Sequence, residues 1–148
     1  MSLPCLVISG VPQGSVLGPL LFLILLCDID HQIVGSLVKS FADDTRIMKS
    51  ISSTSDIEVL QKDLKTIYTW ADTNNLCFHD SKCQLIQYGK NENLKLLGNY
   101  STNTQNCIEA CESVCDLGVK MTNDASNQQA KQCPGFVVPI DQDQQQLC

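Results

Sequence analysis

Two adjacent carboxylates set between apolar segments constrain this chain more than any other feature. Asp43 and Asp44 lie in the sequence FADDT, residues 41–45, with Val38 before them and Ile47 after them. Apolar residues on both sides of a short polar step predict a strand, a tight turn and a return strand. Neighbouring carboxylates repel each other unless a divalent cation or a basic group neutralises them. The sequence therefore predicts a hairpin whose tip is a candidate cation site.

A glycine-rich segment with the sequence GVPQGSVLGPLLF, residues 10–22, precedes this pair. Its glycines predict a loop whose backbone can approach another surface closely. Ser15 can cap a following helix, and Pro19 can lie in its first turn. Residues 20–26 are apolar all round, which predicts a helix that is buried on most of its sides and central to the core.

In this order and at this distance, the two motifs resemble the palm of reverse transcriptases from non-LTR (LINE-type) retrotransposons. The similarity continues through residues 70–82, which follow the family's W…N.L.FN..K pattern, and through DLGV at residues 116–119. It covers about residues 7–121. The resemblance implies an α+β fold, a partial polymerase palm in which antiparallel strands and an Asp-Asp hairpin pack on helices. Three residues depart from the family's pattern, namely Cys27, His79 and Cys115.

The resemblance also implies the chemistry. It makes Asp43 and Asp44 catalytic residues that bind Mg²⁺ or Mn²⁺ for RNA-directed DNA synthesis by two-metal phosphoryl transfer. The residues that it places near the template and the incoming nucleotide are Gln13, Gly14, Phe41 and Lys82. Without the resemblance, Lys82 would be interpreted as a surface lysine in a turn.

The family's third metal-binding Asp belongs to a motif upstream of the glycine-rich loop, and residues 1–9 contain neither Asp nor Glu. Two carboxylates alone hold a cation weakly and cannot assemble the in-line geometry of the reaction. We therefore expect the 148-residue chain to be inactive by itself. The alternative is a non-enzymatic, domesticated or pseudogene-like protein with an interaction role, in which the Asp pair is a relic.

The net charge of the chain affects how tightly it can bind nucleic acid. The chain has 10 Lys and Arg against 16 Asp and Glu, a net charge of −6, whereas a nucleic-acid-binding domain usually presents a basic face. We expect an RNA template and a DNA primer to bind this chain weakly or not at all. A palm that begins at this point would also expose a sheet edge and part of the apolar helix, which favours self-association.

The nine cysteines are odd in number, and several lie in apolar segments, which indicates reduced thiols in an intracellular protein of the cytoplasm or nucleus rather than a secreted one. Cys107, Cys111 and Cys115 are spaced by four, which raises a zinc hypothesis, but zinc ligands usually come in two close pairs. Incidental cysteines are the preferred interpretation. Asp28 and Asp30 with His31 similarly suggest a second metal site, but a helix end and solvated loop is the preferred interpretation, because acids clustered between apolar segments usually mark turns. The apolar run at residues 16–27 is too short to span a bilayer.

The rest of the chain gives a coarser picture. Ser55 and Glu58 have capping-box spacing and predict the start of an amphipathic helix that ends at residues 74–75. Lys62 and Lys65 on this helix form either a solvated face or, as the less favoured alternative, a nucleic-acid contact. Residues 84–88 predict a strand. Residues 1–121 would form the palm and the start of the next hairpin, and the Gln-rich residues 122–148 a disordered or loosely packed tail.

Overall fold

The computed structural model describes residues 14–41, 44–76, 78–88, 99–102, 106–123 and, as backbone, 135–139. Helices and antiparallel strand pairs make up this part of the chain, so the predicted α+β class is confirmed. The helices are α1 (Gly18–Cys27), α2 (Ile29–Gln32), α3 (Thr54–Thr73) and the 3-10 helix η1 (Asp80–Lys82). The strands are β1 (Leu37–Phe41), β2 (Asp44–Met48), β3 (Gln84–Leu85), β4 (Tyr100–Ser101), β5 (Cys107–Ile108), β6 (Ser113–Asp116), β7 (Val119–Thr122) and β8 (Gly135–Pro139).

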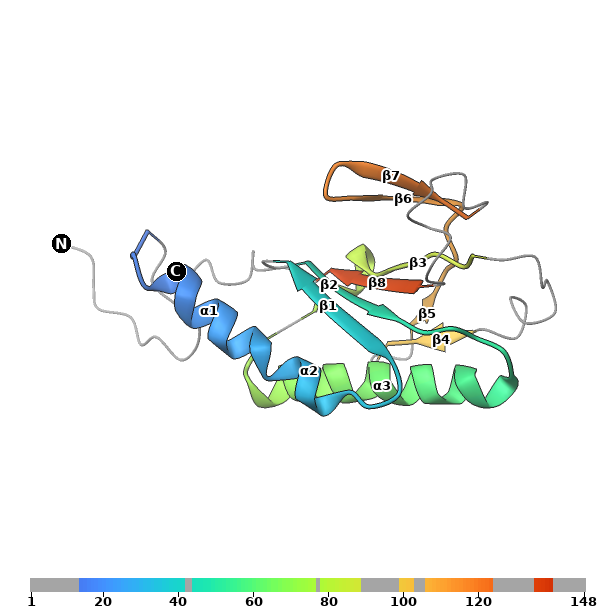
Figure 1. The fold of residues 1–148 in the computed structure, drawn as a ribbon, viewed down its shortest axis with the longest axis horizontal. Coiled ribbons are helices and arrows are strands. Elements are labelled where there is room, and N and C mark those ends of the chain that lie inside the picture. Colours follow the sequence, from blue (N-terminus) through green and yellow to red (C-terminus); the bar gives the residue numbers. More distant parts are fainter. Residues whose placement is uncertain are drawn as a thin grey trace.

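The main sheet has the strand order β1-β2-β8-β3, and each neighbouring pair is antiparallel. Figure 1 shows the long helix α3 running along one side of this sheet, with the β6–β7 hairpin on the other side. Two shorter ladders, β4–β5 and β6–β7, complete the described strands. In the described sheet β1 is a terminal strand, so its outer backbone edge lacks a neighbouring strand there.

The amphipathic helix α3 supplies much of the core. Leu60, Leu64, Ile67 and Ala71 are buried along one face, at the spacing of three and four that the sequence predicts. The helix ends at Thr73, also as predicted. Buried residues of α1, α2, β1 and β2 join the same hydrophobic cluster, so α3 is held against both the sheet and the two N-terminal helices.

The predicted start of α3 is wrong by two residues. The capping box is formed by Ser53 and Asp56, not by Ser55 and Glu58. The Asp56 carboxylate accepts hydrogen bonds from the backbone N–H groups of Ser52 and Ser53, both at 3.0 Å. The pairs Ser53–Asp56 and Ser55–Glu58 have the same spacing. Ser53 is the residue at the N-cap, so Asp56 forms the reciprocal hydrogen bonds of the capping box.

Helix α1 differs from the prediction of a helix buried on most sides. Gly18, Phe22 and Leu26, which recur every four residues, are its buried residues. The other apolar side chains are about half exposed, namely Leu20, Leu21, Leu23 and Ile24. Figure 1 shows why: α1 projects beyond the end of the sheet, so the core receives only Phe22 and Leu26, with the partly buried Leu25 packed against it. The expectation that part of this helix is uncovered agrees with the structure.

The C-terminal segment also differs from the prediction. Residues 122–148 were expected to pack loosely, yet Gly135–Pro139 form β8 between β2 and β3. The sequence of this strand contains Phe136, Val137 and Val138, and aromatic and β-branched residues favour extended backbone. A short strand-forming run inside a polar composition therefore decides its local structure. The boundary at residues 121–122 remains a prediction.

Candidate active site

Strands β1 and β2 flank the acidic pair. Their register runs from Leu37 opposite Met48 to Phe41 opposite Asp44. Two residues, 42 and 43, separate the two strands in sequence, and they lie outside the described residues. Asp44 is thus the first residue of β2, whereas Asp43 lies outside the described residues.

Asp44 lies on the face of the β1–β2 pair that points away from the core. Burial along β2 alternates: Thr45 and Ile47 are buried, and Asp44, Arg46 and Met48 are partly exposed. Successive strand residues point to opposite faces, so the buried residues fix which way the acid points. A side-chain hydrogen bond of 3.0 Å between Ser40 and Thr45 adds a cross-strand tie beside it. A one-residue slip of β2 would bury Asp44, so the core sets the orientation of the acid.

Two basic residues share this open face. Lys39 and Arg46 are directly opposite each other in the register, and Arg46 is two residues along β2 from Asp44. Residues that face each other across an antiparallel pair lie on the same side of it. The face therefore combines a carboxylate with a lysine and an arginine. Sequence reasoning missed both: counting by two along the strand from Asp44 identifies Arg46, whereas Lys39 requires the register with β1.

Phe41 is the predicted site residue that the structure brings next to Asp44. It ends β1 opposite that residue, and its side chain is 64% exposed. Gly14 lies elsewhere, in the turn before α1, with a φ of +77° that favours glycine. Gln13 lies outside the described residues. Lys82, the last residue of η1, is exposed.

A polar network holds η1, and with it Lys82, against α3. The Tyr68 hydroxyl donates to Asp80 Oδ1 at 2.9 Å, and the Thr102 hydroxyl donates to Asp80 Oδ2 at 3.0 Å. Burial, together with the neighbouring Cys83 and Asp80, raises the pKa of Tyr68. Burial likewise raises the pKa of the Cys83 thiol, so this cysteine is not an activated nucleophile. The network is a structural one that joins α3, η1 and the segment after β4.

Metal ligands do not gather elsewhere in the described part of the chain. No three His, Cys, Asp or Glu side chains there lie close enough to hold a metal ion. Asp28, Asp30 and His31 are among the residues for which this holds. The three cysteines of the zinc hypothesis are separate too: Cys107 is in β5, Cys111 follows it and Cys115 is in β6. The Asp43–Asp44 pair is not covered by this observation because Asp43 is not described, and its metal site stays a prediction. None of the described helices is long and apolar enough to cross a membrane.

The model of the family named reverse transcriptase (RNA-dependent DNA polymerase) matches residues 5–130. The chain belongs to the reverse transcriptase family. Curated relatives agree with this, since the chain is 33% identical over 90 residues to the RNA-directed DNA polymerase from mobile element jockey of Drosophila melanogaster. The corresponding polymerase of Drosophila funebris is 33% identical over 88 residues.

Each of these alignments covers 54% of the chain and 10% of the relative, so the chain spans about a tenth of the length of the jockey polymerases. No solved structure matches the chain significantly. The predicted resemblance to reverse transcriptases of non-LTR elements is thus confirmed. The reverse transcriptase match includes the glycine-rich loop, the β1–β2 pair, η1 and the β6–β7 hairpin, and it ends before β8.

Proposed function

We propose that this chain is part of a retrotransposon-derived reverse transcriptase and that its β1–β2 hairpin carries polymerase metal ligands for RNA-directed DNA synthesis. The observation that supports this most is the register of Phe41 opposite Asp44 inside the segment that matches the family. It leaves two residues for the turn, so Asp43 and Asp44 follow each other at the end of the strand pair. In this proposal the hairpin belongs to the polymerase palm.

The residues available suit a hard divalent cation. Carboxylate oxygens are the ligands that Mg²⁺ and Mn²⁺ prefer, and Asp44 is partly exposed on the face opposite the core. When bound, two such ions activate the primer hydroxyl and neutralise charge on the triphosphate. Asp43 and Asp44 would hold the ions, while Thr45 and Ile47 anchor the strand that carries Asp44.

The surrounding side chains would orient the substrates. Lys39 and Arg46 attract phosphate groups toward the open face, because positive charge concentrates anions near a surface. Phe41 offers an exposed aromatic ring for a nucleotide to pack on. Gln13, Gly14 and Lys82 are proposed to lie near the template and the nucleotide. RNA template and DNA primer are the proposed partners, bound weakly because the chain is acidic.

We also propose that these 148 residues alone do not extend a primer. The reaction needs a third carboxylate beside the hairpin, and residues 1–9 contain none. A primer-extension assay with an RNA template and a DNA primer tests this. Template-dependent product that disappears in an Asp43→Asn, Asp44→Asn variant would overturn the inactivity while supporting the site.

We also propose an intracellular location for the protein. The five described cysteines that form no disulfide suit a reducing compartment.

Divalent-cation binding tests the site itself. Titration calorimetry with Mg²⁺ or Mn²⁺ is compared for the wild type, for Asp43→Ala with Asp44→Ala, and for Asp28→Ala with Asp30→Ala as a charge-matched control. We expect the hairpin variant to lose binding and the control to keep it. Equal binding by all three would reject the hairpin as a metal site and favour the non-enzymatic interaction role.

A further inference from the structure

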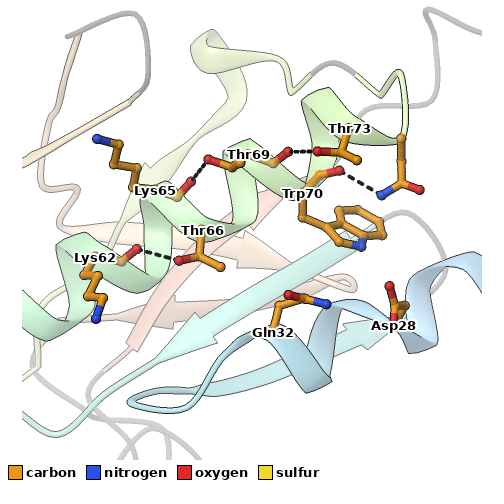
Figure 2. A pocket seen from close by; sticks show the side chains of 9 residues that line it. Asp28, Gln32, Lys62, Lys65, Thr66, Thr69, Trp70 and Thr73 are labelled. Atoms are coloured by element: carbon orange, nitrogen blue, oxygen red, sulfur yellow. Dashed lines mark hydrogen bonds between the residues drawn. The ribbon is translucent and has the colours of Figure 1, made fainter.

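A groove of about 560 Å³ lies between α3 on one side and α2 with the preceding Asp28 on the other. Figure 2 shows Asp28 and Gln32 on one side of it and the successive turns of α3 on the other. A volume of this size is in the range of small-molecule sites. None of its lining residues belongs to the β1–β2 pair, so the groove is separate from the proposed polymerase metal site.

Lysines provide the positive charge of the groove. Lys62 and Lys65 line it, both side chains are exposed, and no ion pair to either lies within the described part of the chain. Thr66, Thr69 and Thr73 line it as well, but their hydroxyls donate to carbonyls of α3 at 2.8–3.1 Å. The threonine protons are thus already used, and the lysines are the charged donors available to a ligand.

Trp70 supplies an unsatisfied donor at the other end of the groove. Its side chain is only 6% exposed, and its indole nitrogen is buried without a hydrogen-bond partner in the described residues. Such a donor costs free energy until an acceptor reaches it. Figure 2 shows the indole facing Asp28 and Gln32, whose side chains are exposed and can move aside for an acceptor oxygen.

The spacing of these donors sets the size of the ligand. Lys62 and Trp70 are eight residues apart on α3, about 12 Å along the helix axis. Inorganic phosphate is too small to span that separation, whereas a nucleotide spans it from its phosphate to the edge of its base. The Asp28 carboxylate repels a phosphate at the Trp70 end and can accept a hydrogen bond from a base amino group there. The lysines at one end of the groove and Asp28 at the other therefore favour a single orientation of the bound ligand.

We propose that the α2–α3 groove binds a nucleotide unit, with its phosphate at Lys62 and Lys65 and its base at Trp70, Gln32 and Asp28. The unit comes either from a free nucleotide or from a single strand of nucleic acid, which share this chemistry. The proposal rests on the groove alone and is independent of metal binding at the hairpin.

Trp70 is the only tryptophan of the chain, so its fluorescence reports on the groove directly. The 148-residue chain is titrated with adenosine monophosphate, with a single-stranded oligoadenylate and with inorganic phosphate, all without divalent cations. We expect a saturable change in Trp70 fluorescence with the first two probes and none with phosphate. Tighter, salt-dependent binding of the oligoadenylate would assign the groove to a strand, and equal binding would assign it to the free nucleotide.

Matched lysine variants locate the phosphate. Lys62→Gln and Lys65→Gln should each weaken binding about three- to five-fold, as expected for exposed, screened charge pairs. Lys120→Gln, which removes the same charge from the exposed strand β7, should leave binding unchanged. The proposal is overturned if adenosine monophosphate causes no saturable change, if phosphate causes the same change, or if Lys120→Gln weakens binding as much as the groove variants.

Discussion

The Tyr68 hydroxyl donates a hydrogen bond of 2.9 Å to the Asp80 carboxylate and so ties the long helix α3 to the 3-10 helix that ends in Lys82. The two residues are twelve apart in sequence, and Tyr68 is buried. Thr102 of the segment after β4 donates to the other oxygen of the same carboxylate. One acid therefore holds together three parts of the chain, and the position of Lys82 depends on it.

A double-mutant cycle measures this tie. Tyr68→Phe should lower the free energy of unfolding by about 1 kcal/mol, because it leaves Asp80 with one side-chain donor fewer. Asp80→Asn should lower it as well, and the double variant by less than the sum. Urea denaturation of the four proteins gives the coupling. Strictly additive changes would show that the hydrogen bond does not contribute to stability.

The capping box at the start of α3 predicts a dependence of stability on acid. Hydrogen bonds from the backbone of Ser52 and from the side chain of Ser53 lower the pKa of Asp56 below its ordinary 3.8. A lowered folded pKa means that the unfolded chain binds the proton more readily. This contribution to stability is thus present above about pH 4 and is lost as the pH falls through the folded pKa.

NMR titration of the Asp56 carboxyl should show the lowered pKa directly. Thermal melts between pH 2 and pH 6 should show a smaller loss of stability with acid for Asp56→Asn than for the wild type. A wild-type Asp56 that titrates at the value of an unstructured peptide would contradict the capping box.

Gly35 lies where the loop before β1 packs closely against α3, so we expect a larger side chain there to be destabilising. A Cβ built on Gly35 would collide with Val59 Cγ1 and lie 2.9 Å from Asp63 Oδ2. Gly35→Ala should therefore destabilise the fold by about 1–3 kcal/mol, the usual cost of overpacking. Val59→Ala removes the first obstacle, so the double variant should recover part of the loss in denaturant titrations. A neutral Gly35→Ala would show that the loop moves away freely.

The exposed side of α1 predicts self-association. Leu20 is 54% exposed and Ile24 is 60% exposed, one turn apart on the same side of the helix. Replacing both by Gln should reduce association in sedimentation velocity and leave the thermal melt unchanged, since neither side chain belongs to the described core. Unchanged sedimentation would point instead to the β1 edge or to a monomer.

Local pattern predicted the parts of the structure that depend on neighbours in sequence. The apolar stripe of α3, its end at Thr73 and the strands around Asp44 follow from periodicity and turn chemistry. The cap of α3 was misplaced because Ser53–Asp56 and Ser55–Glu58 fit one motif equally well.

The structural features that the sequence did not predict depend on contacts between segments far apart in the chain. Composition alone predicts that α1 is a core helix, but its burial depends on what lies beside it, and only the side with Phe22, Leu25 and Leu26 packs against the described core. Strand β8 lies in a polar segment and is fixed by pairing with β2 and β3. Lys39 could be placed beside Asp44 only when the register of β1 and β2 was known. The groove beside Trp70 likewise requires α2 and α3 to meet.

Mn²⁺ provides the sharpest test of a divalent-cation site at Asp43 and Asp44, because this ion broadens the NMR signals of nearby nuclei. We expect Mn²⁺ to broaden the amide signals of Phe41 and Asp44 selectively, excess Mg²⁺ to restore them, and Asp43→Ala with Asp44→Ala to abolish the effect. Broadening centred on Asp28 and Asp30, or unchanged signals at Phe41 and Asp44, would contradict it.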